Sequence, residues 1–187
     1  MTSRASLSRS AWTSRRVAGP EKGAVLIEAA LAFPLLVVLL LGLVEFSEAL
    51  AVNRKLSNAA ATVSDLVSQV RQVSTSELDD ITHVADTLLA PYNATRLGLV
   101  ITSVRADKDN RATVAWSYAH GAGATARAPG SALTLPPGLT EAHGSVILAE
   151  TSYQFTPTIG LYLTGVIHLA GRAYFRPRVS SAVTKAD

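Results

Sequence analysis

Residues 24–44 read AVLIEAALAFPLLVVLLLGLV, a run of 21 residues that contains one charged side chain, Glu28. A helix rises 1.5 Å per residue, so this run is long enough to cross the hydrocarbon core of a membrane, which is roughly 30 Å thick. Fourteen of its residues are Val, Leu, Ile or Phe. Their summed insertion free energy outweighs the cost of one carboxylate near the end of the run, so the sequence predicts a transmembrane helix over 24–44.

Basic residues are concentrated ahead of this helix. Residues 1–23 carry five Lys or Arg and one Glu, a charge of +4, whereas residues 24–187 carry 12 basic and 13 acidic groups, a charge of −1. Segments rich in Lys and Arg stay in the cytoplasm, which predicts a cytoplasmic leader over 1–23 and export of residues 45–187. The pI of about 9.4 therefore reflects the leader, and it gives no support for a nucleic-acid partner.

The composition argues against several classes of protein. Hydrophobic residues make up 48% of the chain and charged residues 17%, which is too apolar for a disordered protein. The sequence has no cysteine, which excludes disulfides, thiolate metal sites and cysteine nucleophiles, and it has no phosphate-binding or nucleophile-elbow motif. The histidines show no metal-ligand spacing and are expected at the surface or in packing contacts: His83, His120, His143 and His168. We therefore expect no enzyme activity, no cofactor, and no catalytic or metal-binding residue.

The residues at the start of the apolar run form a further pattern. Lys22 and Gly23 end the basic leader, and Glu28 is the fifth residue counted from Ala24. This order resembles the processing site of prepilins, in which the membrane prepilin peptidase cuts after a glycine and leaves glutamate as the fifth residue. The resemblance implies cleavage between Gly23 and Ala24. An ionisable side chain in a membrane helix is also a functional candidate on physical grounds, although a carboxylate near the helix end can reach the interface.

The same run carries three further motifs: Glu28-Ala29-Ala30, Phe33-Pro34-Leu35-Leu36 and Gly42-Leu43-Val44-Glu45-Phe46. In combination they resemble the TadE-like family of tight-adherence (Flp-type) pilus proteins over about residues 22–60. The family commonly continues with glycine and arginine after Glu-Phe. This chain has Ser47 and Glu48 at those places.

The resemblance implies a function as well as a family. It implies a minor pilin, or pseudopilin, of a tight-adherence (Flp) type IV pilus that acts in pilus assembly, initiation or adhesion. The protein would be a single-pass protein of the bacterial inner membrane with its C-terminal domain in the periplasm, and would later reach the pilus fibre or cell surface. Implied partners are the major Flp-type pilin, other minor pilins, the prepilin peptidase and the pilus assembly platform, in a hetero-oligomer.

Elementary electrostatics gives Glu28 a role in such an assembly. Cleavage after Gly23 would leave an ammonium group on Ala24 at the membrane face, where Glu28 of an adjacent subunit could pair with it. Two unit charges about 4 Å apart attract by roughly 4 kcal/mol at an effective dielectric constant of about 20, before desolvation is subtracted. The pair would select the register between subunits. Pro34 removes a backbone hydrogen bond, which predicts a kink or local melting of the helix.

Three alternatives remain open on the sequence. A signal peptidase could cut after Ala49-Leu50-Ala51, but an apolar core of 21 residues is longer than the roughly 7 to 15 residues of a signal peptide. The chain could instead stay unprocessed, as a bitopic periplasmic scaffold or sensor protein. An anchored or secreted enzyme would need a site built from dispersed residues.

Beyond the membrane, apolar residues alternate spacings of three and four, which predicts an amphipathic helix over 45–73. The stripe consists of Ala49, Val52, Leu56, Ala59, Val63, Leu66, Val70 and Val73. It would pack on the protein's own sheet, on neighbouring subunits, or on both at different heights. A second helix then begins with Ser74 or Ser76 as its cap and ends at Pro91.

After Pro91 the apolar period becomes two, and the sequence predicts strands at 97–105, 112–118, 146–155 and 166–175. Residues 107–110 read as a turn rather than a calcium loop. Residues 120–144 hold five of the twelve glycines and are expected to form an irregular loop. The predicted fold class is α+β, with a long N-terminal helix, a short second helix and a small antiparallel sheet, and residues 74–187 form the exported domain.

Overall fold

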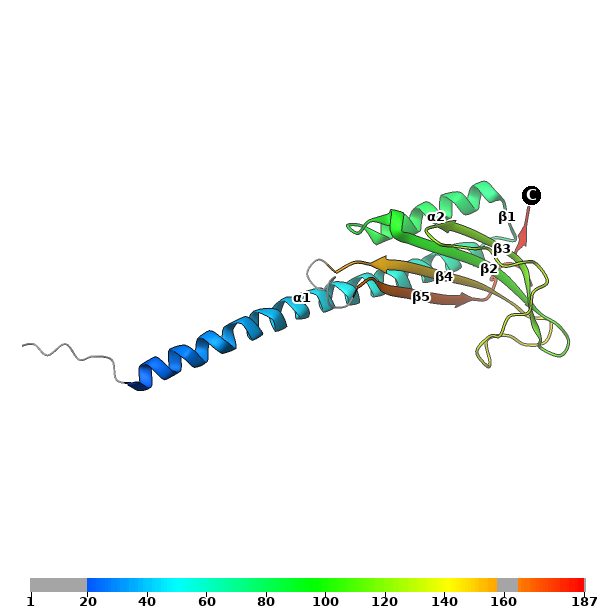
Figure 1. The fold of residues 1–187 in the computed structure, drawn as a ribbon. Helices are drawn as coiled ribbons and strands as arrows, with labels where there is room; N and C mark the ends of the chain where they lie inside the picture. The colour runs from blue at the N-terminus through cyan, green and yellow to red at the C-terminus, as the bar shows by residue number, and fades with distance from the viewer. Residues whose placement is uncertain (1–19, 158–164, 187) are drawn as a thin grey trace, which may run out of the picture. The chain divides into compact units, whose positions relative to one another are not determined.

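The computed structural model describes residues 20–157 and 165–186 of the chain (Figure 1). The chain divides into two compact units, Met1–Leu41 and Gly42–Asp187. The first helix, α1, spans Pro20–Ser68 and therefore belongs to both units. Unit 1 is described only as the N-terminal part of this helix, whereas all other helices and strands belong to unit 2.

Helix α1 ends at Ser68, before the predicted end of the amphipathic helix at residue 73. The Ser68 hydroxyl donates to the carbonyl oxygen of Asp65 in the last turn, at 2.7 Å. Gln72–Val73 then form a short strand, β1, which pairs in parallel with β6, Thr184–Lys185. Val73 continues the apolar spacing of the helix and is buried, but it belongs to a strand. The spacing of apolar residues alone does not distinguish a last helical turn from a short buried strand.

The apolar stripe of α1 packs within the chain in unit 2. Its fully buried members are Val52, Leu56, Ala59 and Val63, and two further α1 residues, Ala60 and Val67, are fully buried beside them. Leu66 belongs to the predicted stripe but is only half-buried, because the 3.6-residue period of a helix brings Val67 to the core in its place. Packing on the protein's own sheet, one of the two alternatives for this stripe, is therefore confirmed over residues 52–67.

Helix α2 spans Thr75–Leu89 and begins with one of the two predicted caps. The Ser74 amide donates to Glu77 Oε2 at 2.7 Å, and the Glu77 amide donates to Ser74 Oγ at 3.3 Å, which is a reciprocal capping box. The hydrogen bond from the Ser74 backbone lowers the pKa of the Glu77 carboxyl. The helix stops just before Pro91, as the sequence predicts.

Helix α1 supplies contacts that fix both α2 and the sheet. Lys55 donates through Nζ to the carbonyl oxygens of Leu88 and Ala90, at 3.2 and 2.7 Å, and so satisfies acceptors at the C-terminal end of α2. The next residue, Leu56, is fully buried, and its carbonyl oxygen accepts a bond from Thr151 Oγ1 at 3.1 Å. Two adjacent residues of α1 thus hold the second helix and a central strand.

Within the described ranges, four antiparallel strands form a sheet in the order β3-β2-β4-β5. They are β2 Leu97–Ala106, β3 Ala112–Gly121, β4 Ser145–Phe155 and β5 Ile167–Phe175. A 3-10 turn, η1 at Ala94–Arg96, leads into β2. The α+β class, the second helix and the predicted strands are confirmed, and no strand end differs from its prediction by more than three residues.

One face of the sheet carries the core. Alternate residues of β2 and β4, among them Leu99, Ile101 and Ile147, join the buried side chains of α1 and α2 in one cluster. Figure 1 shows the C-terminal part of α1 and helix α2 running beside the strands. The alternation of side chains along the strands thus places the apolar residues on one face of the sheet, and the two helices pack against that face.

An ion-pair network lies on the other face of the sheet. Glu150 alternates with the core residues of β4, so its carboxylate points away from the helices. Arg127, from the irregular segment between β3 and β4, contacts Glu150 Oε2 at 2.5 Å and donates to Thr102 Oγ1 at 3.3 Å. Arg172 of β5 lies 3.1 Å from Glu150 Oε1. The predicted loop begins at residue 120, but β3 continues to Gly121, so the irregular segment starts two residues later. The Arg127–Glu150 ion pair holds this segment to the sheet.

The β2–β3 connection is the predicted turn. Asp107 Oδ1 accepts bonds from the amides of Asp109 and Arg111, each at 2.8 Å. Asn110 has a φ of 57°, a left-handed conformation that asparagine tolerates. The Asp107 carboxylate thus accepts hydrogen bonds from backbone amides of the turn, as in an Asx turn.

A substitution at Gly171 tests the contact between α1 and the sheet. A Cβ at this position would lie 2.8 Å from the Leu56 carbonyl carbon and the Ser57 nitrogen, both backbone atoms of α1. We expect Gly171→Ala to lower the free energy of unfolding by about 1–3 kcal/mol, because α1 must shift away from β5. Urea unfolding of the detergent-solubilised chain, followed by tryptophan fluorescence, measures the loss.

Gly42→Ala is the matched control for that experiment. Nothing lies within 4 Å of a Cβ added at Gly42, and alanine is a better helix former, so stability should stay equal or rise slightly. A Gly171→Ala protein as stable as the parent would contradict the close-packing account.

Candidate functional site

The N-terminal part of α1 presents an apolar surface to its surroundings. From Gly23 to Leu41 every side chain is exposed apart from Val37 and Leu41, which are half-buried. The exposed large apolar residues before the unit boundary are Val25, Leu26, Ile27, Leu31, Phe33, Leu35, Leu36, Val38, Leu39 and Leu40. In water such a surface would be unstable, so this part of the helix requires lipid or other apolar segments around it.

This exposure separates the segment from a core helix. Among the residues that the structure describes, one helix is long and apolar enough to cross a membrane, Gly23–Ser68. The 18-residue window that satisfies this criterion is not buried at all. The N-terminal helix therefore fits a single-pass membrane protein.

The predicted cleavage residues lie in the first turns of this helix. Gly23 is the fourth residue of α1, which begins at Pro20, and both Gly23 and Ala24 are exposed. The first amides of a helix have no intrahelical acceptor, so this end opens more easily than the helix interior. The Gly23–Ala24 bond is thus accessible, although it must leave the helical conformation to enter a protease.

Glu28 and Pro34 lie further along the same exposed surface. Glu28 is exposed and is the one charged residue of the predicted transmembrane run. Pro34 lies inside α1, which continues on both sides of it. Two roles stay predictions: the pairing of Glu28 with a neighbouring molecule, and the kink at Pro34.

A groove opens where α1 enters unit 2. It has a volume of about 390 Å³ and is lined by Leu43, Val44, Ser47, Glu48, Ala51 and Tyr92. Ser47 and Glu48 stand where the resembled family commonly has glycine and arginine. The Ser47 hydroxyl donates to the Leu43 carbonyl oxygen at 2.8 Å, so its hydrogen bond is made within the helix, one turn back.

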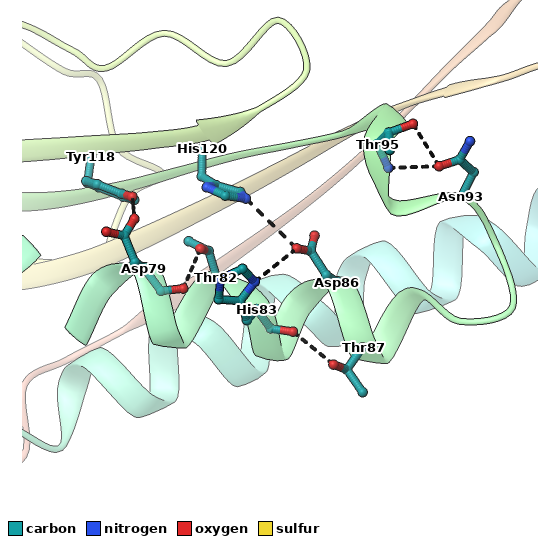
Figure 2. A network of polar contacts seen from close by, with 9 residues as sticks. All are labelled: Asp79, Thr82, His83, Asp86, Thr87, Asn93, Thr95, Tyr118 and His120. Atoms are coloured by element: carbon teal, nitrogen blue, oxygen red, sulfur yellow. Dashed lines mark hydrogen bonds and ion pairs between the residues drawn. The ribbon is translucent and has the colours of Figure 1, made fainter. Parts of the chain in front are cut away.

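A polar cluster that the sequence did not predict joins α2 to β3 (Figure 2). Asp86 of α2 lies between two histidines, with its Oδ2 at 3.6 Å from His83 Nδ1 and at 3.9 Å from His120 Nε2. The two imidazole rings meet edge to face, with their centroids 6.1 Å apart. In the same cluster the Tyr118 hydroxyl donates to Asp79 Oδ1.

This cluster links helix α2 to strand β3 through polar side chains. Tyr118 and His120 are alternate residues of β3, while Asp79, His83 and Asp86 recur at helical spacing on α2. No group of three or more His, Cys, Asp or Glu side chains in the described part of the chain has a geometry that could hold a metal ion. The contacts therefore position α2 on the sheet. Their signal in the sequence was weak because the α2 and β3 residues lie about 35 to 40 positions apart.

The other two histidines lie elsewhere in unit 2. His143 has a φ of 62° in the segment before β4, and His168 is an exposed residue of β5 paired in register with Gln154. Within the described residues, neither belongs to a group of side chains that could hold a metal ion.

Comparison with known proteins finds one family similar to this chain along α1. The model of the TadE-like protein family matches residues 23–65, which confirms the resemblance seen in the sequence. No curated protein and no solved structure matches the chain. The match extends along α1 from Gly23 to Asp65, and it supports a pilin-like protein associated with a Tad pilus. The family is not known to be enzymatic.

The Tyr118 hydroxyl provides a spectroscopic test of the cluster. Desolvation, followed by the hydrogen bond to Asp79 and its charge, raises the pKa of Tyr118 to about 12. Because the pKa of Tyr118 is raised in the folded state, the protonated hydroxyl stabilises the fold fully below about pH 10, and this contribution to the free energy of unfolding is lost as the pH rises toward 12. Absorbance titration of the tyrosines should show one group titrating near 12, which Tyr118→Phe removes. Tyr92→Phe, just beyond the C-terminal end of α2, should leave that step in place; loss of the step in the Tyr92 variant would contradict the assignment.

Proposed function

We propose that this protein is a minor pilin, or pseudopilin, of a tight-adherence (Flp) type IV pilus, processed by prepilin peptidase and active in pilus assembly, initiation or adhesion. The observation that carries the proposal is the exposed apolar part of α1, with Glu28 as the fifth residue counted from Ala24 and with a folded α+β unit built on the same helix. The TadE-like match over residues 23–65 supports it.

Processing would change what holds the chain in the membrane. Hydrolysis of the Gly23–Ala24 bond leaves a carboxylate on Gly23 and an ammonium on Ala24, and it releases a leader of charge +4. The leader's basic residues keep it on the cytoplasmic side, so their removal lowers the barrier to lifting the helix out of the bilayer. Without cleavage, the protein would remain a bitopic anchor.

Glu28 would then set the register between subunits. A carboxylate exposed on an apolar helix is costly inside lipid or a helix bundle unless it finds a partner. The new ammonium of Ala24 on an adjacent subunit meets that need. Only one axial offset between neighbouring helices brings these two groups together, so the pair specifies how subunits stack.

Pro34 would let the same helix adapt during extraction. Its nitrogen has no hydrogen, so the helix lacks one backbone bond one turn before this residue. A helix weakened at one point can bend or unwind locally while its remaining bonds stay intact. The proposed location is the inner membrane, with unit 2 in the periplasm, followed by the pilus fibre or the cell surface.

The proposed partners follow from these steps. Cleavage requires the prepilin peptidase, and extraction requires the pilus assembly platform. The exposed surface of α1 would pack against the helices of the major Flp-type pilin and of other minor pilins, which makes the protein part of a hetero-oligomer.

The N-terminal residue of protein isolated from bacterial membranes tests the processing step. We expect Ala24 in the parent and an intact leader in Gly23→Asp, because a charged side chain next to the scissile bond hinders entry into the protease. Terminal sequencing or intact mass measures both, with Gly42→Ala as a control that should be processed normally. Met1 in the parent would favour an unprocessed scaffold or sensor, and Val52 would indicate a signal peptidase product.

Substitution of Glu28 tests the pairing step. We expect both Glu28→Ala and Glu28→Gln to insert in the membrane and lose their leader, but to be absent from sheared pili, because neither supplies a negative charge. Immunoblots of pilus and membrane fractions measure the distribution. Glu141→Ala, which removes an exposed carboxylate 3.6 Å from Arg176, is the control and should be incorporated as the parent is. Equal incorporation of the Glu28 variants would refute the pairing role.

A further inference from the structure

A second groove lies in unit 2, beside β3 and the C-terminal strand. It has a volume of about 450 Å³ and is lined by Arg105, Ala115, Trp116, Ser117, Pro129, Val183, Thr184 and Lys185. Its floor is fixed by the Trp116 indole, which donates through Nε1 to the Val183 carbonyl oxygen at 2.8 Å. Val183 is fully buried, so the groove is built on a rigid base.

One side of the groove is formed by the edge of β3. The irregular segment 122–144 covers the first part of this edge, where Val114 donates to Ser131 and accepts from Gly130, at 2.9 and 2.8 Å. From Ala115 to Gly121, no backbone hydrogen bond from outside the sheet reaches this strand within residues 20–157 and 165–186. Such an edge offers amides and carbonyls to an added strand.

The groove is also positively charged. Arg105 is exposed and Lys185 is half-buried, and both belong to its lining, which includes no carboxylate. Within the described parts of the chain, neither the Arg105 guanidinium nor the Lys185 ammonium makes a hydrogen bond or an ion pair; Arg105 is bonded to a side chain only through its carbonyl oxygen, which accepts from Thr113. Other cations of this unit do have partners: Arg127 and Arg172 contact Glu150, and Arg178 contacts Asp65. Two cations that have no charged partner among residues 20–157 and 165–186, lying beside an open strand edge, favour an anionic occupant that can itself form a strand.

We propose that this groove binds an extended acidic segment of a partner protein, which adds to the free edge of β3 and places its carboxylates against Arg105 and Lys185. In an extended chain alternate side chains point the same way and recur about 6.6–6.8 Å apart, so carboxylates at every second residue can face the groove together. The intervening side chains would lie away from it. This site lies outside the segment proposed for pilus assembly, and its test does not depend on that function.

The test measures peptide binding to the full chain in detergent micelles. The probe is a fluorescent peptide of about nine residues in which Glu and Val alternate, and its counterpart carries Lys in place of Glu. We expect saturable anisotropy with the Glu peptide and none with the Lys peptide. The double substitution Arg105→Gln and Lys185→Gln should weaken binding by about five- to tenfold, since two partly exposed charge pairs are removed. Lys108→Gln, in the β2–β3 turn, is the control and should bind as the parent does.

A second measurement tests the strand addition. Hydrogen exchange at amides in Ala115–Gly121 should slow when the Glu peptide binds, because a new strand protects them. Failure of the Glu peptide to bind, or equal binding by the double variant, would overturn the proposal. Equal affinity for dextran sulfate would overturn the assignment to a peptide, and self-association abolished by the double variant would assign the groove to a second copy of the chain.

Discussion

The contacts that α1 makes with α2 through Lys55 and with the sheet through Leu56 are the constraint on which the rest of unit 2 depends. Lys55 closes the C-terminal end of α2, and the Leu56 carbonyl accepts a bond from Thr151 in β4. Gly171 leaves the space that lets the helix backbone approach β5. Because the backbone of α1 lies directly against β5 at Gly171, this approach tolerates little displacement, and it lies within the buried stripe from Val52 to Val67.

The same helix must be stable in two environments. Its N-terminal part exposes apolar side chains around its circumference, and its C-terminal part buries one stripe on the sheet. An α-helix satisfies its own backbone hydrogen bonds in either setting, so one uninterrupted element can serve both. The change in side-chain pattern near Glu45 and Glu48, and not a change in backbone, separates the segment suited to lipid from the segment suited to a protein core.

Much of the fold could be predicted because its signals are local. The capping box at Ser74 and Glu77, the period-two strands and the glycine-rich segment after β3 each involve neighbouring residues. The β1–β6 pair could not, because Gln72 meets Thr184 and no nearby residue signals the contact. The polar cluster between α2 and β3 was missed for the same reason. At the candidate site the order of Gly23, Ala24 and Glu28 was readable, since it lies in one short run, but the groove beside Trp116 depends on a C-terminal strand that the sequence did not reveal.

The return of the C-terminal segment to the end of α1 has a mechanical consequence. The Arg178 amide donates to the Ser68 carbonyl, its guanidinium contacts Asp65, and β6 runs parallel to β1 just beyond the helix. The helix is thereby tied to unit 2 at two separate places, at its last turn by the C-terminal segment and at Leu56 by Thr151. A load on α1 has two sets of bonds to break before the helix leaves the rest of the unit.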